Sequence, residues 1–390
     1  MTPFEPASAR FEFPIDVADV LAERARQMVA WGIARQTVSQ VGPRIASMWA
    51  DGPAGWAYEW SRAAESMQAK GSFLQAALLY GAAKFPCIVS RAQERAYARQ
   101  LACFRLASWE FAVPFWRDVL WVGNGDAQTK VAVHRYGARV NSRTQPLLCL
   151  TGGVDTLKVE LHRLASLIAR ATGFEVVAFD MPGTGESMLA LSKDSEWVYR
   201  AVLESCGGAH RSKGIFGLSF GGHWAAKLAL RGDVDFAVDL GGPIAATASD
   251  GALLANLPHG MTGIVANAMR LAALPTPAMA ATILEAFSLA AQGLLTPQSL
   301  KSMSPLLAIN GDDDPYVRPD DSLLFHGGPQ NTVWLVPSAG HCAERRLRLL
   351  MPAILMWVRA QAYGTWSDRL AYRAASALLR PWIAGKSISA

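Results

Sequence analysis

The pattern of apolar positions in the first third of the chain is helical. Apolar side chains within 60–67 recur at the spacing of one helix face, Gly71 interrupts them, and 73–80 repeats the pattern as far as Pro86. Seven of the 13 tryptophans also lie in this part of the chain. We therefore predict a helical domain over residues 1–125, packed as a cap or flanking domain beside the rest of the chain.

From residue 126 onward, short apolar runs alternate with segments of helical periodicity. Strands are predicted at 130–138, 146–150, 175–179, 214–217, 235–240, 306–309 and 332–336. Helices are predicted between them, at 157–172, 196–203 and 222–230. Strands separated by helices form a mostly parallel, doubly wound sheet that is covered on both faces. The predicted fold class is therefore α/β, with residues 126–390 forming the sheet-containing domain.

One segment between two predicted strands, residues 251–300, is almost free of charge. Arg270 and Glu285 are its only formally charged residues, and its apolar positions follow a helical pattern that prolines interrupt. A segment of this kind leaves the sheet and covers apolar surface. Two interpretations stay open: a helical lid over an apolar substrate, or an interface between subunits, which would make the protein a homodimer.

The composition of the 390-residue chain is that of a globular protein, with 51% hydrophobic and 18% charged residues. These proportions exclude disorder and collagen-like structure. The formal net charge is +5, and residues 341–390 hold eight basic and only two acidic residues. We interpret this excess as a solvated helix face or as a contact with an anionic partner. No compact basic run with interleaved aromatic residues indicates nucleic-acid binding.

Cysteine usage and the N-terminus indicate a reducing compartment. The five cysteines are widely spaced and form no CxxC pair, which argues against both a disulfide framework and a zinc site. The first 20 residues lack the apolar core of a signal peptide, and no span is apolar enough for a transmembrane helix. We therefore expect a soluble cytoplasmic protein.

Residues 217–221 read Gly-Leu-Ser-Phe-Gly, which matches the pattern GxSxG. A predicted strand ends just before Ser219, and a predicted helix begins just after it. A serine on such a sharp turn projects from the edge of the sheet, and small residues are needed at Gly217 and Gly221 because the backbone crosses closely there. We predict that Ser219 is a nucleophile on this turn, the nucleophile elbow.

A serine nucleophile at neutral pH needs a base, and the base needs an orienting carboxylate. In this architecture the chain order is serine, acid, histidine. Of the seven histidines, only His341 has that order and a loop position after a late strand. For the acid we favour Asp314 over Asp312 and Asp313, because of its Gly-x-x-Asp spacing after the strand at 306–309. No metal site is expected at these aspartates, which lack further ligands at suitable spacing.

The oxyanion that develops in acyl transfer needs backbone donors. Phe220, the residue after the nucleophile, supplies one N–H. The second should come from the glycine-rich loop after the strand at 146–150, where glycine lets the backbone face the substrate. Gly153 is our first choice for this donor and Val154 the second.

Longer motifs surround these residues. TGGVDTLKVEL and VVAFDMPGTGES lie within 150–187, and GLSFGG, DLGGPI, INGDDDPYV and SAGHC follow them. Together they resemble the α/β-hydrolase superfamily, and more closely its FrsA-like esterase branch, to which dihydroxypseudooxynicotine hydrolase and fungal polyketide-shortening hydrolases are similar. The resemblance covers about 127–357. It implies an α/β-hydrolase fold with an N-terminal helical domain, a triad of Ser219, His341 and Asp314, and no cofactor.

The expected function is that of a serine hydrolase acting on a small apolar molecule, such as an aromatic or polyketide-like compound. The resemblance implies cleavage either of an ester or of a carbon–carbon bond beside a ketone, and both reactions stay open. Two other functions also stay open: an acyltransferase that uses the same triad, and a non-catalytic protein-binding module that keeps the fold.

Overall fold

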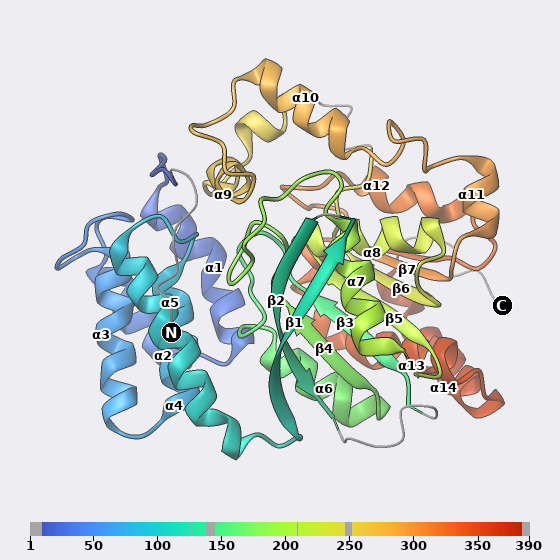
Figure 1. Cartoon of the computed structure of the whole chain (residues 1–390), viewed down its shortest axis with the longest axis horizontal. Coiled ribbons are helices and arrows are strands. Elements are labelled where there is room, and N and C mark those ends of the chain that lie inside the picture. Colours follow the sequence, from blue (N-terminus) through green and yellow to red (C-terminus); the bar gives the residue numbers. More distant parts are fainter. Residues whose placement is uncertain (1–9, 126, 138–144, 209, 246–251, 384–390) are drawn as a thin grey trace.

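The computed structural model describes residues 10–125, 127–137, 145–208, 210–245 and 252–383 (Figure 1). These residues form a central eight-stranded sheet with the order β1-β2-β4-β3-β5-β6-β7-β8. β2 is antiparallel to both neighbours, and the strands from β4 to β8 are parallel. The strand bounds are β1 Phe115–Asn124, β2 Ala127–Tyr136, β3 Leu147–Thr151, β4 Glu175–Phe179, β5 Lys213–Leu218, β6 Phe236–Leu240, β7 Leu306–Gly311 and β8 Thr332–Val336.

The middle of the sheet is buried on both faces, which explains why its strands are nearly continuous apolar runs. Every residue of β3, β4 and β6 is buried. In β3, Leu148 belongs to the core beneath helices α6 and α13, whereas Cys149 belongs to the core beneath α7 and α8. The α/β fold class predicted from the sequence is confirmed. The helices that cover the sheet are α6 His162–Thr172, α7 Glu196–Gly207, α8 Phe220–Arg231 and α13 Leu347–Tyr363.

In the described part of the chain, five α-helices precede the sheet and pack along its side (Figure 1). α3 and α4 form an antiparallel hairpin around Gly71, whose φ of +74° suits a residue without a side chain. Most of their buried apolar residues belong to the same apolar core as the α7/α8 side of the sheet. The bounds are α1 Val17–Trp31, α2 Arg35–Val41, α3 Trp56–Ala69, α4 Phe73–Lys84 and α5 Arg91–Ala107.

The expectation of helix throughout residues 1–125 was wrong at 115–124. These residues form β1, which pairs with β2 over its whole length. Exposed and partly buried residues alternate along most of β1, and this period of two is the signature of a strand with one covered face. The helical segment therefore ends before the sheet begins, and the position of a domain boundary at 125 stays a prediction. The helix expected at 157–172 begins only at His162.

The charge-poor segment between β6 and β7 forms helices above the carboxyl ends of the strands (Figure 1, yellow to orange). Its first residue, 251, lies outside the described residues. The helix α9 is buried along its whole length, whereas α10 buries only Ala280 completely. The elements are the 3-10 turn η4 Leu254–Asn256, α9 Met261–Ala268, α10 Pro277–Phe287 and α11 Pro297–Ser302.

The basic C-terminal part continues after β8 as α13 and α14 Trp366–Leu379. Two of its arginines have acidic partners: Arg345 lies 2.5 Å from Asp313, and Arg359 lies 2.9 Å from Asp368. Part of the positive charge therefore stabilises the fold itself. None of the described helices is long and apolar enough to cross a bilayer.

Candidate active site

Ser219 lies on the sharp turn between β5 and α8. Its φ of 55° and ψ of −129° are unusual for a residue with a side chain, and such a conformation costs on the order of 1–3 kcal/mol. Two backbone hydrogen bonds hold it: the Ser219 N–H donates to Leu240 O over 2.8 Å, and the Gly222 N–H donates to Ser219 O over 2.7 Å. The sheet thus fixes the serine at its carboxyl edge, with the hydroxyl facing the pocket above.

The two glycines of the GxSxG pattern have no room for a side chain. A Cβ at Gly217 would lie 2.0 Å from Gly221 O, and a Cβ at Gly221 would lie 2.7 Å from Gly152 O. The close crossing expected from the sequence is therefore present at both positions. Gly222, which sequence reasoning did not single out, is equally tight, since its Cβ would lie 2.0 Å from Oδ1 of Asp239.

The structure brings Ser219, His341 and Asp314 into one chain of hydrogen bonds. Nδ1 of His341 lies 2.7 Å from Oδ2 of Asp314, and Nε2 lies 2.8 Å from Oγ of Ser219. Because a carboxylate only accepts, Nδ1–H donates to Asp314, and Nε2 is left as the acceptor for the serine hydroxyl. This tautomer is the one in which imidazole can take a proton from the serine.

The surroundings of Asp314 favour its ionised form. Its Oδ1 accepts from the backbone N–H groups of Tyr316 and Val317, at 2.8 and 3.2 Å, and its Oδ2 accepts from Nδ2 of Asn310 at 2.8 Å. Burial alone would raise the pKa of this carboxyl, but His341 and these donors lower the pKa below its ordinary value. Asp314 is thus a permanent negative charge against the imidazole.

The surroundings of His341 raise the pKa of its imidazole. Burial lowers the pKa of the imidazole, but the adjacent Cys342 and Asp314 groups outweigh burial and raise the pKa well above 6.5. Sγ of Cys342 lies 3.0 Å from Leu240 O, and Cys342 is not one of the residues that line the pocket above Ser219.

The neighbouring aspartates hold the histidine loop instead of contacting the ring. Oδ1 of Asp312 accepts from the Ser338 N–H at 2.7 Å, and Oδ1 of Asp313 accepts from the Gly340 N–H at 2.6 Å. Within the described residues, no group of three or more His, Cys, Asp or Glu side chains is arranged to hold a metal ion. Of the three successive aspartates, only Asp314 therefore contacts the imidazole of His341, and the other two hold the backbone of its loop.

Two of the expected oxyanion donors lie beside the serine. Phe220 is the first residue of α8, so its N–H has no partner within the helix. Gly153 lies directly opposite, where an added Cβ would be 2.9 Å from Oγ of Ser219 and 3.3 Å from N of Phe220. Among the described residues, the backbone N–H groups of Gly153 and Val154 donate no hydrogen bond. This geometry is suited to binding a negatively charged oxygen.

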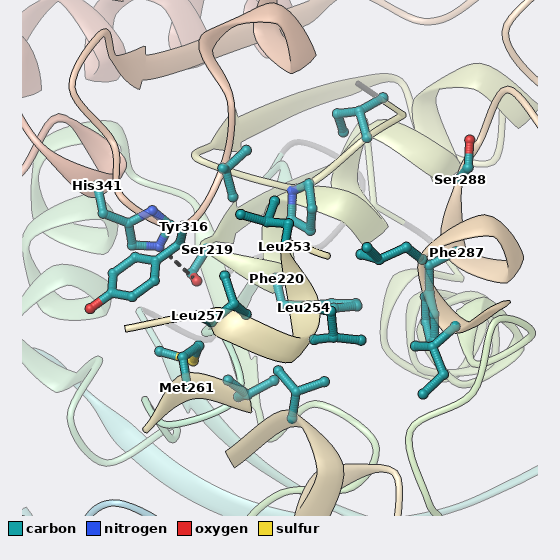
Figure 2. A pocket seen from close by; sticks show the side chains of 17 residues that line it. Ser219, Phe220, Leu253, Leu254, Leu257, Met261, Phe287, Ser288, Tyr316 and His341 are labelled. Atoms are coloured by element: carbon teal, nitrogen blue, oxygen red, sulfur yellow. Dashed lines mark hydrogen bonds between the residues drawn. The ribbon is translucent and has the colours of Figure 1, made fainter. Parts of the chain in front are cut away.

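A pocket of about 770 Å³, counting the space at its mouth, opens above Ser219 and His341 (Figure 2). Most of its wall is aliphatic or aromatic, and the segment between β6 and β7 supplies the larger part. The lining residues are Val154, Ser219, Phe220, Pro243, Ile244, Leu253, Leu254, Leu257, Met261, Val265, Ile283, Leu284, Phe287, Ser288, Tyr316, Val317 and His341.

Tyr316 is a pocket residue that sequence reasoning missed. Its ring meets that of His341 edge-on, with centroids 5.1 Å apart. Its hydroxyl donates to Oε1 of Glu23 at 3.2 Å and lies 2.6 Å from Nδ1 of His259. The sequence shows only that an aromatic residue stands two positions after the expected acid. This position does not predict the contact of Tyr316 with α1.

Comparisons with known proteins agree with this architecture. The sequence profile of the family described as "Esterase FrsA-like" matches residues 46–334. Esterase FrsA of Photobacterium profundum is 24% identical over 299 residues, which cover 70% of this chain and 68% of the relative. Esterase FrsA of Vibrio cholerae is 26% identical over 286 residues, covering 69% and 67%.

Two solved structures share the fold over nearly their whole length. AbyA5 superposes with a TM-score of 0.76 at 23% identity, covering 94% of this chain and 99% of its own. The 2,6-dihydroxy-pseudo-oxynicotine hydrolase has a TM-score of 0.63 at 18% identity, covering 93% and 97%. The fold is thus that of the α/β-hydrolases, as the resemblance of the motifs implied, and the chain belongs to the FrsA-like esterase family.

Proposed function

We propose that this α/β-hydrolase is a serine esterase with Ser219 as the nucleophile, His341 as the base and Asp314 as the orienting acid. The observation that carries the proposal is the unbroken chain of hydrogen bonds from Asp314 through His341 to Ser219 at the floor of an apolar pocket. A non-catalytic binding module would not need a strained serine held 2.8 Å from an imidazole.

The reaction follows from the positions of the protons. Nε2 of His341 takes the hydroxyl proton as Oγ of Ser219 attacks the ester carbonyl carbon, and Asp314 stabilises the imidazolium that forms. The carbonyl electrons move onto oxygen, and the N–H groups of Phe220 and Gly153 receive this oxyanion, with Val154 as the alternative second donor. The imidazolium then protonates the departing alcohol, which leaves an acyl group on Ser219.

The second half of the reaction releases the acid. Water enters the place of the alcohol, Nε2 of His341 takes one of its protons, and the resulting hydroxide oxygen attacks the acyl carbon. The second oxyanion collapses, Ser219 regains its proton from His341, and the carboxylic acid leaves. No step requires a cofactor.

The substrate class follows from the pocket wall. Leu254, Leu257, Met261 and Phe287 surround the reactive serine with carbon atoms (Figure 2). A charged acyl group would lose its hydration there without gaining a partner, which costs several kcal/mol. We therefore expect neutral, apolar esters, including those with an aromatic or polyketide-like acyl part.

The test is hydrolysis of p-nitrophenyl esters of increasing acyl length, by the wild type and by Ser219→Ala. We expect hydrolysis that improves from acetyl to longer neutral chains, weak hydrolysis of succinyl esters, and at least a 10³-fold lower rate for the variant. Equal rates for wild type and variant would refute the proposal.

Carbon–carbon cleavage beside a ketone and acyl transfer use the same serine, and both stay predictions. A β-diketone series and assays with added alcohol acceptors, run in the same panel, separate them from ester hydrolysis. A carboxylic acid from the diketone indicates the first, and a new ester from the acceptor indicates the second.

A further inference from the structure

Helix α1 of the N-terminal part contacts the two loops on either side of the serine. On one side, Glu23 accepts a hydrogen bond from the hydroxyl of Tyr316, which follows Asp314 in the same loop. On the other side, Arg24 and Gln27 contact the loop that carries Gly153. Glu23, Arg24 and Gln27 lie within about one turn of the helix. A single helix far from the triad in sequence thus contacts both sides of the site.

The contacts on the Gly153 side form a closed ring of four side chains. Nη1 of Arg24 donates to Oε1 of Gln27 at 2.9 Å, and Nε2 of Gln27 donates to Oγ1 of Thr156 at 3.1 Å. Oγ1 of Thr156 donates to Oδ1 of Asp155 at 3.1 Å. Oδ2 of Asp155 lies 3.0 Å from Nη2 of Arg24, and this last contact is an ion pair that lacks the geometry of a hydrogen bond. The ring thus joins α1 to two successive residues of the loop.

The ion pair in this ring is buried. The side chains of Arg24 and Asp155 are only 6% and 7% exposed. Lys84 of α4 provides a second contact with the loop, since its Nζ donates a hydrogen bond to Asp155 O at 3.3 Å. Breaking a buried ion pair leaves an uncompensated charge, so moving the loop away from α1 has a large cost in free energy.

The loop needs such an external support because of its sequence. Gly152 and Gly153 have no side chains that could pack and fix the direction of their N–H groups. Thr156 folds back onto Gly152, where an added Cβ would lie 2.1 Å from Thr156 O. Whatever holds Asp155 and Thr156 therefore also determines where Gly153 stands relative to Ser219.

We propose that Arg24 is a positioning residue for the reaction, whose ring with Gln27, Thr156 and Asp155 holds the Gly153 N–H where the oxyanion forms. This inference rests on the proposed function. An oxyanion donor acts through its geometry in the transition state, and loss of one donor costs about 10²–10³-fold in rate. Arg24 does not line the pocket, and its hydrogen bond and ion pair are made to Gln27 and Asp155 instead of the triad.

The test compares Arg24→Met, Asp155→Asn and the double variant. Arg24→Met should lower kcat about 10²-fold with little change in KM, because the substrate's apolar contacts remain. The inhibition constant of a trifluoromethyl ketone, which forms a tetrahedral adduct on serine, should rise in parallel. The inhibition constant of an ether analogue of the ester should stay unchanged, since the ether has no carbonyl oxygen and forms no such adduct.

The double variant separates positioning from stability. It leaves no unpaired charge, so its melting temperature should return toward that of the wild type, while kcat stays low. Recovery of kcat together with melting temperature would overturn the inference. Lys227→Met is the matched control: Lys227 is buried and lies 3.0 Å from Glu196, and its loss should lower the melting temperature without the loss of kcat.

Labelling by a fluorophosphonate distinguishes this inference from the proposed function. A wild type that forms no adduct at Ser219 would refute the function itself. An adduct in the wild type, together with unchanged kcat and ketone inhibition in Arg24→Met, would overturn only the role of Arg24.

Discussion

At the scale of single residues, the position of one proton decides whether Ser219 can react. Only neutral His341 can accept the hydroxyl proton, and Asp314 stabilises the protonated form of the same ring. Burial lowers the pKa of His341, but Cys342 and Asp314 outweigh burial and raise this pKa above its ordinary value. The imidazole of the folded protein therefore keeps its proton to higher pH than an exposed histidine does.

Activity should increase with pH as His341 loses its proton. We expect kcat/KM for a neutral ester to rise tenfold per pH unit at low pH and to level off, with a midpoint above 6.5. The profile of initial rates from pH 5 to 10 measures this midpoint. A midpoint at or below 6.5 would contradict the charge balance described for the imidazole.

Asp314→Asn is the control for the cause of this shift. An amide cannot stabilise the imidazolium, so the midpoint should move to lower pH and kcat should fall by about 10⁴-fold. The same profile for Asp313→Asn should keep the wild-type midpoint, since Asp313 contacts the Gly340 N–H and Arg345 instead of the ring.

Gly153→Ala should damage the reaction without unfolding the protein. The added Cβ would come within 2.8 Å of Cβ of Ser219, so either the loop or the serine must shift. We expect kcat/KM to fall at least 10²-fold with a nearly unchanged circular dichroism spectrum. Gly52→Ala is the matched control, because nothing lies within 4 Å of its added Cβ. Wild-type kinetics in Gly153→Ala would exclude Gly153 from the oxyanion site.

The sequence was sufficient to predict the triad residues, because their order along the chain is characteristic of this architecture. Ser219, Asp314 and His341 could be singled out because each follows a predicted strand in the order that this architecture requires. Tyr316 and Arg24 could not be singled out, because their contacts join segments that are distant along the chain. The identity of a tyrosine or an arginine does not by itself predict which distant residue it contacts.

At the scale of elements, the helices between β6 and β7 shape the pocket. The sequence indicated a charge-poor helical segment and favoured a lid, with a subunit interface as the alternative. In the structure its side chains line the pocket above Ser219, which supports the lid; an interface on its outer face stays a prediction. The choice could not be made from periodicity, because both roles need the same apolar pattern.

The strand β1 was missed for a related reason. Its tryptophans fit a helix as well as a strand, and only the pairing with β2 distinguishes the two.

Phe287 of α10 offers a test of the lid. Its ring meets that of Phe220 edge-on at 5.3 Å within the pocket wall. Phe287→Ala should raise KM for medium-chain esters roughly tenfold, because about 1–2 kcal/mol of apolar contact is lost, and should favour bulkier acyl groups. Steady-state kinetics across the ester series measures both effects. Met279→Ala, on the outer side of α10 at 47% exposure, should behave like the wild type.

At the scale of the whole molecule, one apolar core joins the N-terminal helices to the sheet. Trp60 of α3 and Trp224 of α8 are both fully buried in this core. The sequence predicted the sheet and the helical N-terminal part but not their common core, because amphipathic patterns show which face is buried and not against what. The shared core is also what brings α1 to the active site.

Unfolding should therefore be a single cooperative event. Tryptophan fluorescence reports on both parts, and far-ultraviolet circular dichroism reports on all helices, so their urea transitions should coincide. Two separated transitions would mean that the N-terminal helices unfold independently of the sheet, and that their contacts with the site are weak.

The central claim is that Ser219 is an activated nucleophile, and intact-mass analysis after fluorophosphonate labelling tests it most directly. The wild type should gain the mass of one phosphonyl group, and Ser219→Ala should gain none. The folded state of both proteins is checked by circular dichroism. An unlabelled, folded wild type, or a variant labelled to the same extent, would contradict the assignment of Ser219.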